Sequence, residues 1–278
     1  MITSTNNDRI KNIVQLNNSS KARHIQNAFA AEGIRMFMEA PLLCIDEVYL
    51  SEELHDKINI AVRYDDDNDE AQLLKKCASK LKETGYEEVS AQVFKKMSDT
   101  VTPQGILTVV REERHRLEEF LEGKDRSDLH VLILENLQDP GNMGTMIRTA
   151  EAAGYDLIIA NEGTVDMYNP KVIRSTMGSI YRMPVIYSPA LSDDIDRLKE
   201  AGVQVYAAHL KAKRDYQEIS YGRRTAVMIG NEGNGLSDKI ASKADEYIKI
   251  PMKGQVESLN AAVAAALIMF SSMHKISK

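Results

Sequence analysis

The chain has 278 residues, of which 43% are hydrophobic and 27% are charged, which suits one large or two ordinary globular domains and excludes wholesale disorder. No run of about 18 apolar residues occurs, so we expect no membrane-spanning helix. The polar N-terminus lacks the apolar core of a secretory signal, which favours a cytoplasmic location. Cys44 and Cys77 make no metal-ligand pattern, so we expect plain thiols and no metal.

The net charge of −6 is unusual for a protein that binds nucleic acid. The acidic excess lies in residues 1–125, however, whereas residues 126–278 carry balanced charge. A local basic face could include Lys21, Arg23 and Arg35. Charge alone therefore leaves RNA binding and a plainly solvated surface equally open.

The first part of the chain predicts a small α/β unit. Apolar spacing indicates helices or strands in the following order: helix 10–16, helix 25–40, strands 42–50 and 60–64, helix 71–84, helix 89–100 and strand 106–110. We assign residues 1–110 to this unit. The charged stretch 111–126 is interpreted as a linker with some helix.

The second part, residues 127–278, predicts a parallel sheet covered on both faces, because strands alternate with helices. The expected strands are 130–135, 156–160, 185–187, 203–208, 225–229 and 247–250, and the expected helices are 142–153, 171–180, 193–201 and a long one from Ser258.

The segment Asn136–Ala150 (NLQDPGNMGTMIRTA) directly follows a buried strand. Asp139-Pro140-Gly141 predicts a turn, and Asn142 is expected to cap the next helix. Ligands of open α/β sheets bind at such strand ends. A purely structural turn, with Arg148 on the surface, has equal weight at this point.

The segment Met228–Ser237 (MIGNEGNGLS) combines a buried strand with three glycines, an amide and an acid. Leu236 stands where a phosphate-binding P-loop needs Lys, and the glycine spacing is not that of a dinucleotide site. The glycines would let backbone groups contact a small ligand. A glycine-rich turn without a ligand is the alternative.

The segment Ile250–Phe270 (IPMKGQVESLNAAVAAALIMF) predicts a strand end, a loop and a helix capped by Ser258. Ser258 and Asn260 lie at the mouth of this helix. Its apolar face indicates core packing or a subunit interface. That face consists of Leu259, Ala262, Val263, Ala266, Leu267 and Phe270.

Together the segments N-x-x-D-P-G-N-x-G-x-x-x-R-T-A, G-N-E-G-x-G-L and I-P-M-x-G-x-V-x-S-L-N resemble the three motifs of the SPOUT superfamily. They are most similar to its TrmH/SpoU branch of RNA 2′-O-ribose methyltransferases. The resemblance spans residues 130–275. FAAEGIRMFMEA and VSAQVFKKMSDTVTPQGILTVV are similar to the RNA-binding domain of the same branch.

The resemblance implies an α/β catalytic domain with a trefoil knot, a homodimer and S-adenosylmethionine as cofactor. Motif positions imply that the methyl donor contacts Gly230, Ile250, Met252 and Leu259. They also imply polar active-site roles for Asn142, Arg148, Glu232, Ser258 and Asn260. The basic candidates Lys21, Arg23 and Arg35 would contact RNA phosphates.

The implied reaction methylates a ribose 2′-hydroxyl, with ribosomal RNA favoured because a separate RNA-binding domain suits a structured target. Three alternatives remain: a transfer RNA substrate, base methylation, and a non-catalytic RNA-binding relative. A housekeeping role and a role in drug resistance are both open. Arg148 is expected to orient the 2′-hydroxyl rather than deprotonate it, because a guanidinium holds its own protons too tightly to act as a good base.

Overall fold

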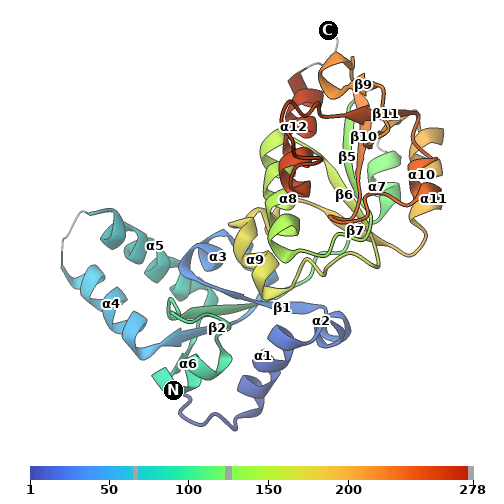
Figure 1. Ribbon diagram of the computed structural model, residues 1–278. Coiled ribbons are helices and arrows are strands. Elements are labelled where there is room, and N and C mark those ends of the chain that lie inside the picture. The colour runs from blue at the N-terminus through green and yellow to red at the C-terminus, as the bar shows by residue number, and fades with distance from the viewer. Residues whose placement is uncertain (65–67, 123–126, 275–278) are drawn as a thin grey trace. The chain divides into compact units, whose positions relative to one another are not determined.

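The computed structural model describes residues 1–64, 68–122 and 127–274, and it divides into two compact units (Figure 1). Unit 1 contains Met1–Glu113 and Tyr168–Tyr181. Unit 2 contains Arg114–Met167 and the residues from Arg182 onward. The units differ from the sequence-based domains chiefly in the segment 168–181, which packs within unit 1. Within the described ranges, no helix is long and apolar enough to cross a membrane.

Unit 1 is built on a four-stranded mixed sheet in the order β1-β4-β2-β3. The strands are β1 Ala28–Glu32, β2 Ile45–Ser51, β3 Glu87–Val89 and β4 Ile106–Arg111. β4 is antiparallel to β1 and β2, and β3 is parallel to β2. Successive side chains alternate between the two faces, so Tyr49 belongs to one buried cluster and Leu50 to another.

Helices cover both faces of this sheet (Figure 1). They are α1 Asp8–Asn18, α2 Ser20–Gln26, α3 Ile34–Glu39, α4 Glu52–Arg63, α5 Asp69–Thr84, α6 Ala91–Met97 and α9 Pro170–Thr176. The strand expected at 60–64 is wrong, because these residues end α4. Leu54, Ile58 and Ala61 form a helical apolar face there, and the Ser51 side chain caps the helix at Leu54 N.

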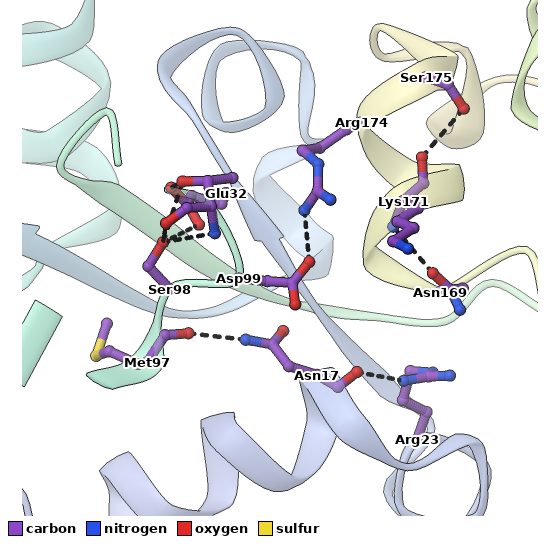
Figure 2. Close-up of polar contacts among 11 residues, drawn as sticks. Asn17, Arg23, Glu32, Met97, Ser98, Asp99, Asn169, Lys171, Arg174 and Ser175 are labelled. Carbon is purple, nitrogen blue, oxygen red and sulfur yellow. Dashed lines mark hydrogen bonds and ion pairs between the residues drawn. The ribbon is translucent and has the colours of Figure 1, made fainter. Parts of the chain in front are cut away.

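The helix α9 packs against β1 of unit 1, although the chain before residue 168, back to residue 114, and after residue 181 belongs to unit 2. Val172 and Ile173 are buried, and Tyr168 stacks on Phe29 with ring centroids 4.5 Å apart. Figure 2 shows Arg174 of α9 paired with Asp99, at 2.9 Å between nitrogen and oxygen. Apolar burial and one ion pair thus hold this segment in unit 1.

Unit 2 contains a seven-stranded sheet in the order β7-β6-β5-β10-β8-β11-β9, in which each strand is parallel to its neighbours. The strands are β5 Leu129–Leu134, β6 Leu157–Asn161, β7 Val185–Ser188, β8 Gln204–Ala208, β9 Arg214–Asp215, β10 Arg224–Ile229 and β11 Glu246–Lys249. β5 is buried along its whole length, as expected for a strand covered on both faces. The predicted parallel α/β fold is therefore confirmed.

Helices lie on both faces of this sheet (Figure 1). They are α7 Leu117–Leu121, α8 Pro140–Ala153, α10 Leu191–Glu200, α11 Asp238–Ala241 and α12 Ala261–His274. α7, α10 and α11 share a buried cluster on one face, and α8 packs with α12 on the other. Leu117 and Phe120, from the expected linker, are part of this core. Residues 123–126 of that linker lie outside the described residues, and the trefoil knot stays a prediction.

Candidate active site

A cavity of about 710 Å³ opens where β8, β10 and β11 end. Its walls come from the segments after these strands and from the start of α12. Loops at the carboxyl ends of parallel strands converge in this way, which is why such edges form ligand sites. All four predicted cofactor residues line the cavity: Gly230, Ile250, Met252 and Leu259. Glu232 and Ser258 line it as well.

The loop 230–237 forms one wall, and its own packing requires a glycine at position 230. A Cβ atom there would lie 2.1 Å from the carbonyl carbon of Gly235 and 2.2 Å from the nitrogen of Leu236. Asn231 holds the turn: its backbone exchanges two hydrogen bonds with Gly235, of 3.0 and 2.9 Å. Its side-chain oxygen accepts from the N–H groups of Gly233 and Asn234. Asn231 was not among the residues predicted from the sequence, although the G-N-E-G pattern contains it.

Three side chains from distant motifs form one hydrogen-bonded network beside the cavity. Asn260 Nδ2 donates to Asn142 Oδ1 at 2.8 Å, and Asn142 Nδ2 donates to Glu232 Oε1 at 3.0 Å. Glu232 also accepts from the backbone N–H groups of Asp139 at 3.0 Å and Gln138 at 3.1 Å. The network ties the turn before α8 to the cavity loop and to the start of α12.

The environment of Glu232 fixes its charge. Partial burial raises the pKa of Glu232, but hydrogen bonds from Asn142 and from backbone N–H groups outweigh this effect. The resulting pKa lies below the ordinary glutamate value. Glu232 is therefore an anion at neutral pH, suited to accepting hydrogen bonds rather than to proton transfer.

Two expected helix caps are wrong by two or three residues. Asp139 caps α8, because its Oδ1 accepts from Asn142 N at 2.7 Å. Asn260 lies before α12, and its Oδ1 accepts from the N–H groups of Ala262 and Val263. Asn142 and Ser258 are thereby free of capping, so the side chain of Asn142 can bridge Glu232 and Asn260.

Arg148 lies on α8, on an exposed face and outside the cavity wall. Within the described residues it has no hydrogen bond or ion pair. The structure thus brings Asn142, Glu232 and Asn260 together and places Ser258 at the cavity, but it leaves Arg148 apart from them. Arg148 is six residues beyond Asn142, which puts it on another helical face.

The three basic candidates of unit 1 have different surroundings. Lys21 and Arg35 are exposed, and Arg35 forms an ion pair with Glu39 at 3.4 Å. Arg23 is only 4% exposed. Its guanidinium donates to the carbonyl oxygen of Leu16 and, as Figure 2 shows, to that of Asn17, both at the end of α1. The inclusion of Arg23 in an exposed basic face is therefore wrong, because this side chain caps a helix end.

His209 also lines the cavity, although no motif in the sequence points to it. Its ring stacks on Tyr247, with centroids 4.8 Å apart, and its Nδ1 accepts from Lys211 N at 3.1 Å. Both contacts fix the orientation of the ring. No spacing rule connects a single histidine after a strand to a cavity formed by three other segments.

Comparisons with known proteins agree with this geometry. Residues 129–270, more than half of the chain, match the SpoU rRNA Methylase family. Residues 7–108 match the MRM3-like substrate binding domain. A relative from Bacillus subtilis, the 23S rRNA (guanosine(2553)-2′-O)-methyltransferase RlmP, is 41% identical over 182 residues, which cover 66% of this chain and 70% of that protein.

Solved structures resemble the full length of the chain. An AdoMet-bound rRNA methyltransferase from Sinorhizobium meliloti has a TM-score of 0.80 and 26% identity, covering 100% of this chain and 98% of that one. An RNA 2′-O ribose methyltransferase has a TM-score of 0.75 and 28% identity, covering 99% and 98%. The predicted resemblance is confirmed, and the chain belongs to the SpoU rRNA methylase family.

Proposed function

We propose that this protein transfers a methyl group from S-adenosylmethionine to a ribose 2′-hydroxyl of ribosomal RNA. The observation that carries the proposal is the junction of three motifs beside one cavity, where Asn142 links Glu232 to Asn260. The 2′-O-methylation of 23S rRNA by the Bacillus subtilis relative supports the reaction and the substrate. The AdoMet-bound rRNA methyltransferase of similar fold supports the cofactor.

The cavity fits the methyl donor in size and lining. Pockets for small molecules commonly measure about 300–1,000 Å³, and this one measures about 710 Å³. We assign Gly230, Ile250, Met252 and Leu259 to holding the donor through backbone groups and apolar contacts. When bound, the donor supplies a methyl group on a sulfonium, which is a good leaving group.

The polar residues supply alignment. Glu232 and Asn142 fix the turn before α8, while Ser258 and Asn260 shape the loop beside the cavity. We assign Arg148 to orienting the 2′-hydroxyl and stabilising its developing negative charge. An RNA phosphate or a water molecule then takes the proton, because a guanidinium holds its own protons too tightly to act as a good base.

We propose a homodimer through the outer face of α12. Val263, Leu267 and Phe270 lie on this face at helical spacing and are 48, 39 and 43% exposed. The opposite face, with Ala262 and Ala265, is buried in unit 2. At such an interface Arg148 of one protomer would lie next to the cavity of its partner, whereas within the described residues of a single chain it is outside the cavity wall.

Unit 1 would select the RNA, because its sequence matches a substrate binding domain. Lys21 and Arg35 are exposed cations that could contact phosphates, and such contacts weaken as salt is added. The proposal includes a cytoplasmic location, which is consistent with an rRNA substrate.

Methylation assays with the purified protein test the function. Tritiated S-adenosylmethionine is incubated with ribosomal RNA fragments and, separately, with transfer RNA, and the products are digested to nucleosides. We expect 2′-O-methylnucleosides from ribosomal RNA, and mapping in cells with and without the protein would locate them. Label in a base, label in transfer RNA alone, or a protein that binds no donor would each overturn the proposal in favour of one alternative.

A further inference from the structure

Glu135, the residue after β5, has a buried carboxylate whose two oxygens contact the same partner. Oε2 accepts from Ser237 N at 2.7 Å, and Oε1 accepts from Ser237 Oγ at 2.6 Å. The side chain is only 6% exposed. The backbone N–H of Glu135 donates to Ile229 O at 3.0 Å, so the residue is anchored between the ends of β5 and β10.

Ser237 is the last residue of the cavity loop 230–237 and also caps α11. Asn136, the residue after Glu135, holds the other end of the loop, because Asn231 Nδ2 donates to Asn136 O at 2.8 Å. Two consecutive residues, Glu135 and Asn136, therefore hold both ends of the loop. Neither Glu135 nor Ser237 lines the cavity.

The packing of the loop makes the position of Ser237 important for the cavity wall. Leu236, its neighbour, lies against Gly230 so closely that a Cβ atom on that glycine would be 2.2 Å from Leu236 N. A shift of Ser237 must therefore move the wall that Gly230 and Gly235 form. We propose that Glu135 is a positioning residue that holds the loop 230–237 in its cofactor-binding conformation. This inference rests on the proposed function.

A carboxylate suits this role because it offers two acceptors to the N–H and O–H of one residue. A buried carboxylate that has no ion pair among the described residues costs desolvation, and an apolar pair would fill the same space without that cost. What the carboxylate adds is a fixed register between β5 and the loop. Glutamine can reproduce it, since its oxygen accepts from Ser237 N while its amide donates to Ser237 Oγ.

Four variants test the proposal: Glu135→Ala, Glu135→Gln, Ser237→Ala and a control, Asp156→Ala. Asp156 Oδ2 accepts from His130 N at 2.8 Å, so the control also removes a carboxylate that holds a backbone N–H, but away from the cavity. The measurements are S-adenosylmethionine affinity by calorimetry, the melting temperature, and hydrogen exchange of amides 231–237.

We expect Glu135→Ala to weaken donor binding at least about ten-fold and to speed exchange in the loop, since two hydrogen bonds to a charged group are lost. Glu135→Gln should restore binding to within about three-fold, and Ser237→Ala should fall between them. Asp156→Ala should lower the melting temperature without either effect. If Glu135→Ala does not fold, the donor affinities of the other two variants decide. The proposal then requires weaker binding in Ser237→Ala than in Glu135→Gln.

Unchanged binding and exchange in Glu135→Ala would overturn the proposal. An equal loss of affinity in Asp156→Ala would do the same, because the effect would then be general destabilisation. If the wild type binds no S-adenosylmethionine, the proposed function fails. The loop exchange rates then still decide whether Glu135 positions the loop.

Discussion

Replacing Glu232 by glutamine tests whether hydrogen bonds at the cavity loop, rather than charge alone, organise the site. Oε1 of Glu232 accepts from Asn142 and Asp139, and Oε2 accepts from Gln138. Glutamine keeps one acceptor and turns the other into a donor. The more favourable orientation of the glutamine amide places its oxygen at the Oε1 position, which keeps the hydrogen bonds from Asn142 and Asp139. The amide N–H group then faces the backbone N–H of Gln138, and that hydrogen bond is lost.

The expected loss of methyl transfer rate follows from the hydrogen bond to Gln138 that glutamine cannot make. A hydrogen bond to a charged group contributes about 1.5–3 kcal/mol when buried. Glu232 is exposed, so water replaces part of the lost contact, and we expect about 1.4 kcal/mol, which is a factor of about ten. The loss should appear in the methyl transfer rate at saturating donor, because the network holds the turn before α8 rather than the donor itself.

The control is Glu257→Gln, which removes the same charge from the cavity wall. Within the described residues, Glu257 has no hydrogen bond or ion pair. Both variants are compared with the wild type in single-turnover methylation of ribosomal RNA and in donor affinity. Equal rates for the two variants would refute the reasoning, since charge would then account for the whole effect.

Other outcomes are also expected. Arg148→Ala should abolish methyl transfer and leave donor affinity within a few-fold, because Arg148 is outside the cavity wall; equal loss of both would contradict its role. Leu267→Glu should turn a dimer into a monomer in light scattering, and a monomeric wild type would exclude the interface. Between about pH 5 and about pH 3 the wild type should lose more unfolding free energy than Glu232→Gln, because a lowered pKa stabilises the fold only while the group is ionised; parallel curves would contradict this. A fragment of residues 114–278, which keeps α7, should still bind the donor and dimerise but lose most RNA affinity; full methylation of native RNA by the fragment would show that unit 1 is not needed.

The sequence predicted residues that line the cavity better than it predicted the hydrogen bonds beside the cavity. Gly230 and Leu259 were assigned to the methyl donor because their motif positions resemble those of the TrmH/SpoU branch, and both line the cavity. The caps were misplaced, because Asp139 and Asn142 are both good capping residues and local pattern does not choose between them. Tertiary contacts decide: Asn142 faces Glu232, ninety positions further along the chain.

Arg23 in unit 1 is a second residue whose surroundings could not be predicted from the sequence. A basic residue near exposed Lys21 suggests a cationic surface, and sequence spacing cannot tell that its guanidinium turns inward. The carbonyl groups at the end of α1 lack helical partners, and Arg23 satisfies two of them. A buried arginine with such contacts stabilises the unit and is not available to a phosphate.

The segment 168–181 shows where local pattern gives an element but not its location. Asn169 caps α9 and Pro170 occupies its first turn, so the sequence NPKVIRST carries the helix signal by itself. Nothing in these residues says that Val172 and Ile173 pack in unit 1, because partners are set by long-range contacts. Burying each such side chain contributes about 1.5–3 kcal/mol, and a fragment of residues 114–278 exposes both. Loss of RNA binding in that fragment therefore needs comparison with an Arg174→Ala full chain, which weakens the same attachment but keeps unit 1 present.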